Sequence, residues 1–139
     1  MAAITAGSAL QAALAAEDAA IFGYGMAGAH LTGSSLSAAM RYWTGHHEAR
    51  DTLAAMISGL GAAPAAAQAF YRLPFRVHDA ATARALAVYL EDGVTRAYLG
   101  LVADRDQRLR HFAALATQSA AQRAAFWRGS TQAFPGLAG

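Results

Sequence analysis

The stretch Glu17–Tyr24, with the sequence EDAAIFGY, recurs later in the chain as Glu91–Tyr98, with the sequence EDGVTRAY. In both copies a Glu-Asp pair is followed by five mostly small or apolar residues and a tyrosine, and matching positions are 74 residues apart. Residues seven apart lie on one face of an α-helix, about two turns from each other. Each copy therefore places a carboxylate and a phenol on the same side of its own helix, and the repeat predicts two related helices.

The composition predicts an all-α domain. The chain has 139 residues, which suits a single domain (residues 1–139) that can bury its own core. Hydrophobic residues make up 55%, but 39 residues are alanine, the best helix former, and only 3 are proline. No apolar run approaches the roughly 20 residues of a membrane span, and the N-terminus lacks the basic region of a signal peptide. We therefore expect a cytoplasmic protein without a membrane partner, and the absence of cysteine excludes disulfides and thiolate chemistry.

The charge pattern does not favour nucleic-acid binding. All 11 basic residues are arginines, they are scattered along the chain, and the net charge is only +2. The one loose group, Arg105, Arg108 and Arg110, alternates with Asp104 and Asp106 in a pattern typical of a solvated helix start. A nucleic-acid interface would need a basic stripe with interleaved aromatic residues. We expect no nucleic-acid partner.

Capping residues and apolar spacing predict the secondary structure. Four helices are expected at about residues 8–32, 36–60, 80–103 and 106–128. Residues 61–79 are too long for a tight turn between antiparallel helices, so we expect a crossover that runs the length of the bundle. Residues 130–139 are expected to form a tail that folds back. Short loop, long crossover and short loop predict a four-helix bundle of two antiparallel hairpins.

The large side chains suggest which face of each helix points inward. On the second helix the predicted interior stripe is Leu36, Met40, Trp43, His47, Arg50, Ala54 and Ile57. On the fourth helix it is His111, Leu115, Ser119, Gln122 and Phe126. Outward apolar positions, which would allow chains to pair, are then Leu53, Met56, Leu60 and Trp127.

A polar layer is predicted halfway along the bundle. In an antiparallel helical hairpin, a residue a given number of positions before the short turn lies level with the residue the same number of positions after it. This places Glu17 opposite His47 and Asp51, with Glu48 beside them, and it places Glu91 opposite Gln118. All four helices would contribute a polar group at this level, with Tyr24, Tyr98 and Gln122 as further hydrogen-bonding groups in the layer.

With these residues identified, the chain resembles the ferritin-like superfamily and, more narrowly, an uncharacterised ferritin-like domain family of high-GC bacteria. The resemblance is carried by residues 14–20, 47–51, 73–75, 90–94 and 133–136. The superfamily implies a di-iron or di-manganese centre, with a Glu from each of two helices and a Glu-x-x-His from each of the other two. Glu17 and Glu91 match the lone Glu positions. The second helix offers His47 and Asp51 in place of Glu-x-x-His, and the fourth offers only neutral amides.

Three interpretations of this layer follow. The first is a buried polar network in which a protonated His47 lies between carboxylates while Tyr24, Tyr98 and the glutamines donate hydrogen bonds. The second is a mononuclear site for Fe, Mn or Zn, with the ligands Glu17, His47, Asp51 and Glu91. The third is a complete di-metal oxidase site. We favour the network, because half of the di-metal ligand set is missing.

We therefore expect a ferritin-like protein with a degenerate metal-site layer, without catalytic activity or a cofactor, that acts as a homodimer or binds a protein partner. The alternative is a carboxylate and histidine site that binds Fe or Mn, as in an oxidase or ferroxidase. A further alternative is a small-molecule binder with its pocket between the helices, where the metal layer would have been.

Overall fold

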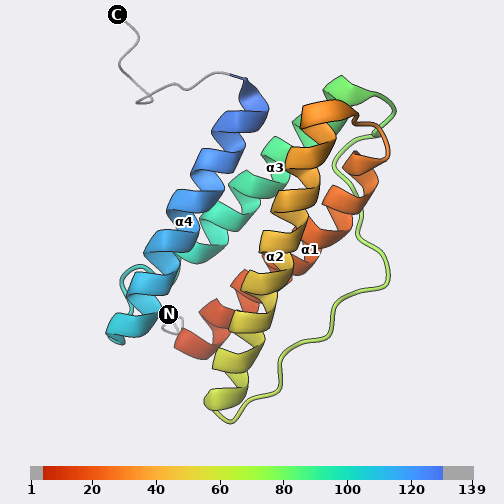
Figure 1. The fold of residues 1–139 in the computed structure, drawn as a ribbon. Helices are drawn as coiled ribbons and strands as arrows, with labels where there is room; N and C mark the ends of the chain where they lie inside the picture. Colours follow the sequence, from red (N-terminus) through yellow and green to blue (C-terminus); the bar gives the residue numbers. More distant parts are fainter. Residues whose placement is uncertain (1–4, 130–139) are drawn as a thin grey trace, which may run out of the picture.

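The computed structural model describes residues 5–129, which form four α-helices and, within that range, no strand. The helices are α1 (Ala6–Gly28), α2 (Gly33–Gly59), α3 (Ala80–Leu99) and α4 (Gln107–Arg128). They form two hairpins, α1–α2 and α3–α4, joined by a crossover that runs along the outside of the bundle (Figure 1). The predicted all-α four-helix bundle is confirmed. The predicted tail, residues 130–139, lies outside the described residues.

Local hydrogen bonds determine where the helices begin. The Thr5 hydroxyl accepts from the backbone N–H of Ser8 at the start of α1. At the start of α3 the Asp79 carboxylate accepts from the N–H of Thr82, and the Thr82 hydroxyl accepts from the N–H of Asp79. This reciprocal capping box satisfies two backbone donors that the helix itself leaves unpaired. At the other end of the chain, α4 stops at Gly129, whose φ of +74° favours glycine.

Two helices are shorter than the sequence predicts. α1 ends at Gly28 because the N–H of His30 bonds to the carbonyl three residues earlier and begins a turn. α3 ends at Leu99, where the N–H of Leu101 makes the same kind of bond. None of the helices within residues 5–129 combines the length and apolarity needed to span a bilayer.

The bundle is open on one side. α1 packs against both α2 and α3, and α3 packs against α4, so the core lies along the first and third helices. Leu10, Leu14, Leu86 and Val94 are buried there. α2 and α4 make little or no backbone contact, and Figure 1 shows them apart.

The predicted inward face of α4 is wrong, and that of α2 is wrong except at Ile57, which is buried, and Leu36, which packs against the core. On α2 the buried residues are Ala38, Ala39, His46, Leu53 and Ile57, and on α4 they are Leu109, Ala113, Ala120, Ala124 and Trp127. Alanines fill half of these positions, whereas several of the large side chains predicted to point inward lie on the surface. The exposed fractions are 63% for Met40, 41% for Trp43, 51% for Leu115 and 41% for Phe126.

The predicted pairing surface changes accordingly. Leu53 and Trp127, expected to point outward, are buried in the core, and Met56 is half-buried against it. Leu60 is exposed. The predicted orientations of α2 and α4 are wrong by a rotation of about 100°, the angle between adjacent residues of a helix. The prediction placed the larger side chains inward, but alanines occupy many of the buried positions.

The crossover is attached to the outer face of α1 at two places. The Gln11 side-chain amide donates to the carbonyl of Ala63 at 2.8 Å and accepts from the N–H of Ala65 at 2.9 Å. Further along, the Phe22 ring lies 5.7 Å from that of Phe70 and 5.5 Å from that of Tyr71, measured between centroids. These contacts keep the crossover along α1, away from the open side of the bundle.

Gly23 marks the closest approach of α1 to α3. A Cβ at this position would lie 2.4 Å from Cδ1 of Leu90 and would also crowd its other branch atoms. We expect Gly23→Ala to lower the free energy of unfolding by about 1 kcal/mol or more, because Leu90 must leave its packed position. Gly25→Ala is the matched control, since its Cβ would meet nothing within 4 Å and the better helix former should stabilise α1 by up to about 1 kcal/mol. Urea unfolding measures both, and equal stabilities would contradict the close approach.

Candidate functional site

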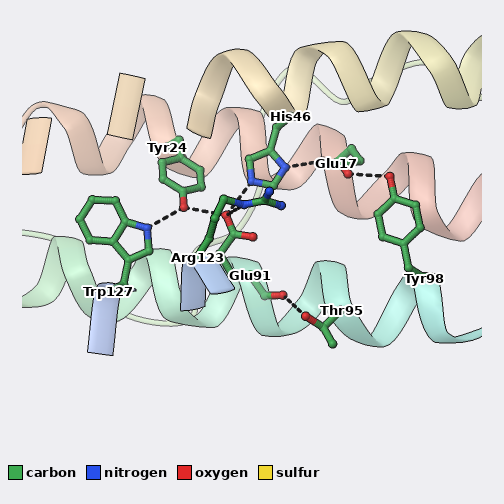
Figure 2. Close-up of polar contacts among 8 residues, drawn as sticks. All are labelled: Glu17, Tyr24, His46, Glu91, Thr95, Tyr98, Arg123 and Trp127. Atoms are coloured by element: carbon green, nitrogen blue, oxygen red, sulfur yellow. Dashed lines mark hydrogen bonds and ion pairs between the residues drawn. The ribbon is translucent and has the colours of Figure 1, made fainter. Parts of the chain in front are cut away.

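Four ionisable side chains meet in the interior, one from each helix, and we refer to them as the charged layer. They are Glu17 of α1, His46 of α2, Glu91 of α3 and Arg123 of α4 (Figure 2). The first three are at most 1% exposed, and the side chain of Arg123 is 18% exposed. The two glutamates are the equivalent positions of the repeated sequence. The histidine and the arginine are the groups that surround them.

His46 bridges the two glutamates. Its Nδ1 bonds to Oε2 of Glu17, and its Nε2 bonds to Oε1 of Glu91 at 2.7 Å. Burial alone would lower the pKa of His46, but the hydrogen bonds and negative charges of the two glutamates outweigh it and raise the pKa to about 9. His46 is therefore an imidazolium at neutral pH, and both of its ring N–H groups donate.

Arg123 supplies the second cation. Its Nε donates to Oε1 of Glu91 at 2.9 Å. Burial would raise the pKa of Glu91, but His46 and then Arg123 lower it below its ordinary value. For Arg123, burial lowers the pKa and Glu91 more than reverses that effect. Two anions and two cations are thus enclosed together, which meets the requirement that buried charges be paired.

Two tyrosines cross-link the repeated sequences. The Tyr24 hydroxyl donates to Oε1 of Glu91 at 2.7 Å, and the Tyr98 hydroxyl donates to Oε1 of Glu17 at 2.7 Å. Each copy's tyrosine therefore binds the other copy's glutamate. Burial, followed by the charge of the glutamate that each contacts, raises the pKa of both tyrosines, so both stay protonated donors. The indole N–H of Trp127 donates to Tyr24 at 2.8 Å and extends the network to the end of α4.

The donors of the charged layer do not fit a di-metal centre. A histidine binds a metal through the lone pair of a neutral ring, but both ring nitrogens of His46 face carboxylates and its raised pKa keeps it protonated. The guanidinium of Arg123 lies against Glu91, where it would repel a divalent cation. Oε2 of Glu91 is buried without a hydrogen-bond partner among residues 5–129, and it is one oxygen where several would be needed. Within the same residues no three His, Asp or Glu side chains are arranged to hold one ion.

The structure does not bring the predicted ligand set Glu17, His47, Asp51 and Glu91 together. His47 is half-buried with its ring edge-on to Trp43, 4.1 Å between centroids, and its Nε2 has no hydrogen-bond partner among the described residues. Asp51 is exposed and bonds to its neighbour Arg50 at 2.9 Å. Both predictions failed for the same reason, since α2 is rotated by about one residue from the predicted phase and His46 takes the inward position.

The predicted supporting layer is corrected in the same way. Tyr24 and Tyr98 lie in the network, whereas Glu48, Gln118 and Gln122 are exposed. Sequence reasoning missed Arg123 and placed Trp127 on the surface. A signal for both exists in the spacing of the small residues, because Ala113, Ala116 and Ala120 continue in steps of three and four to Arg123 and Trp127.

The open side of the bundle holds two adjoining cavities between α2 and α4, of about 310 and 330 Å³. Gly45, Ser119 and Arg123 line both of them, so we treat them as one feature, the α2–α4 groove. Glu17 lines the first cavity, which places the groove directly against the charged layer.

Comparison with known proteins finds a family model and a solved structure that are similar to this chain. A family model described as a domain of unknown function, DUF4439, matches residues 9–139. The crystal structure of a conserved hypothetical protein, Rv2844, from Mycobacterium tuberculosis matches with a TM-score of 0.85 and 32% sequence identity, over 88% of this chain and 93% of that one. No curated protein matches the chain.

Proposed function

The chain belongs to the DUF4439 family, and we propose that it is a ferritin-like bundle in which two protein cations take the place of metal ions. We further propose that it has no catalytic activity of its own and acts by association, as a homodimer or with a protein partner. The observation that carries the proposal is the charged layer, in which His46 and Arg123 balance Glu17 and Glu91.

The chemistry of the layer supports a structural role. In a carboxylate-bridged metal centre, histidine and glutamate donate electron pairs to the metals. Here His46 donates hydrogen bonds to both glutamates, and Arg123 of the fourth helix donates one to Glu91. Each of the four charges of the layer therefore has a partner within the protein, and the layer needs no metal to compensate Glu17 and Glu91.

The surface supports association. Met40 and Trp43 on α2 and Met26 on α1 are 63%, 41% and 45% exposed. Met40 and Trp43 line an apolar cavity of about 310 Å³ together with Gly25 of α1. Exposed apolar side chains of this size gathered at one cavity favour a protein contact. This α1–α2 face replaces the pairing surface that the sequence predicts.

Metal analysis separates the proposal from the metalloprotein alternative. We expect protein purified without chelator, and dialysed against Fe²⁺, Mn²⁺ or Zn²⁺, to retain far less than one metal per chain and to melt at an unchanged temperature. The reason is that His46 and Arg123 already occupy the cationic positions. The measurement is elemental analysis beside thermal unfolding, with light scattering of the same samples to give the oligomeric state.

The matched variants are Glu17→Gln/Glu91→Gln in the layer and Glu48→Gln on the surface. Stoichiometric metal in the wild type that is lost in the double variant and kept in Glu48→Gln would establish the metal site and refute our proposal. A chain that is monomeric at all concentrations, with no partner required for its stability, would refute the homodimer.

A further inference from the structure

The α2–α4 groove has the size of a small-molecule site. Each of its two cavities, of about 310 and 330 Å³, is at the lower end of the range of roughly 300–1,000 Å³ found for ligand pockets. The floor is accessible because α2 carries Gly45 there, and a Cβ built at Gly45 would meet nothing within 4 Å. The groove is therefore open space beside the charged layer.

Arg123, which lines both cavities, has hydrogen-bond donors that are unused among residues 5–129. Its Nε is bound to Glu91, but Nη1 and Nη2 have no hydrogen-bond partner among residues 5–129. The side chain is only 18% exposed, so water does not fully solvate these donors. Because Nε is held by Glu91, the guanidinium is fixed in orientation while Nη1 and Nη2 remain available as donors. Their two N–H groups lie in one plane and match the spacing of the two oxygens of a carboxylate.

The two ends of the groove differ in chemistry. Arg41, Tyr42 and Gln122 line the end toward the N-terminus of α2, and Ser119 lies between the ends. The guanidinium carbons of Arg41 and Arg123 lie 6.0 and 5.9 Å from the centre of the Tyr42 ring, so both cations gather at this end. The other end has an apolar wall on α4, made of Phe112, Leu115 and Ala116.

The acidic residues of the groove limit the charge of a ligand. Glu17 and Glu48 both line the cavity that carries the apolar wall. They would repel a doubly charged phosphate more strongly than a singly charged carboxylate. Arg123 is itself already paired with Glu91, which reduces the positive charge that this residue offers to a dianion.

We propose that the α2–α4 groove binds a small organic carboxylate. Its carboxylate pairs with Nη1 and Nη2 of Arg123, and its apolar body lies against Phe112, Leu115 and Ala116. This inference goes beyond the proposed function, because it requires neither a metal nor a second chain.

The first test uses 4-phenylbutyrate as the probe, with 4-phenyl-1-butanol and inorganic phosphate as comparisons, titrated into the full chain by calorimetry and by NMR of the backbone amides. We expect saturable binding of 4-phenylbutyrate, with the largest shifts at Gly45, Ser119 and Arg123. The alcohol lacks the carboxylate and phosphate lacks the apolar body, so each should bind at least about 10-fold more weakly, the factor that corresponds to about 1.4 kcal/mol. No binding of 4-phenylbutyrate, or equal binding of either comparison compound, overturns the proposal.

The second test fills the groove without weakening the fold. Gly45→Leu places a side chain in the open space and exchanges a poor helix former for a good one, so the variant should be at least as stable as the wild type. We expect it to lose 4-phenylbutyrate binding. Gly25→Leu, at an equally open helical position outside the groove, should bind as the wild type does. Retained binding in Gly45→Leu would show that the probe binds elsewhere.

A third variant tests the fork. Arg123→Lys keeps the positive charge but cannot present two parallel N–H donors, so affinity for 4-phenylbutyrate should fall about 10-fold while the fold is retained. Arg96→Lys, at an exposed arginine of α3, should leave the affinity unchanged. Equal affinities of the two variants would exclude Arg123 as the carboxylate partner.

Discussion

His46→Leu is expected to lower the free energy of unfolding by about 3–5 kcal/mol at neutral pH. The substitution leaves Glu17 and Glu91 in the interior without the imidazolium that bridges them. Oε2 of Glu17 would also lose its hydrogen-bond donor. Removing one partner of a buried ion pair costs far more than the pair itself contributes, because the remaining charge is buried uncompensated. Urea unfolding followed by circular dichroism at pH 7 measures the loss.

His47→Leu is the control, because the neighbouring histidine lies outside the charged layer and is only half-buried. We expect it to change stability by less than about 1 kcal/mol. Adding Glu17→Gln and Glu91→Gln to His46→Leu should recover part of the loss, because the uncompensated charges are then removed. Equal losses for His46→Leu and His47→Leu would mean that the bridging histidine has been assigned wrongly.

Raising the pH should destabilise the protein through the same residue. The pKa of His46 is about 9 in the folded chain against an ordinary value of 6.5, so the folded state binds the proton more tightly than the unfolded state. The stability that this provides is fully present below pH 6.5 and is lost as the pH rises through 9. The difference between the two pKa values corresponds to about 3 kcal/mol. Unfolding free energies measured at pH 6.5 and above pH 9 should differ by about this amount.

The histidine variant provides the control for this pH dependence, since His46→Leu should show little change over the same interval. At acidic pH the dependence has the opposite sign, because stability falls as the pH is lowered. The lowered pKa of Glu91 adds stability above its ordinary value of 4.5, and that stability is lost as the pH falls below it. Wild-type stability that stays constant from pH 6.5 to above 9 would show that His46 is not held as an imidazolium.

The sequence identifies half of the charged layer. Glu17, Glu91, Tyr24 and Tyr98 all belong to the repeat, and they lie on α1 and α3, where leucines and a valine mark the inward face. On α2 and α4 half of the buried residues are alanines, so the positions of the large side chains predicted the wrong phase. The choice between His46 and His47 depends on that phase alone, because adjacent residues point about 100° apart.

Arg123 was missed for a different reason. Reflection across the α3–α4 turn predicts that the residue level with Glu91 lies near position 117, and Arg123 is six residues further along, about 9 Å of helix. Side chains on a helix point toward its N-terminus, and arginine is long, so its guanidinium reaches back to the level of Glu91. A prediction that compares only the Cα positions along the bundle therefore misses long side chains that reach the layer from another level.

The reciprocal tyrosine bonds have a consequence for how the two hairpins align. Each hairpin carries its own ion pair, Glu17 with His46 in one and Glu91 with Arg123 in the other, and Nε2 of His46 also pairs with Glu91 across the two hairpins. Tyr24 and Tyr98 cross between the hairpins in opposite directions. A slip of one helical turn, about 5.4 Å, would break both bonds at once. The duplicated motif thus favours a single register of the two halves.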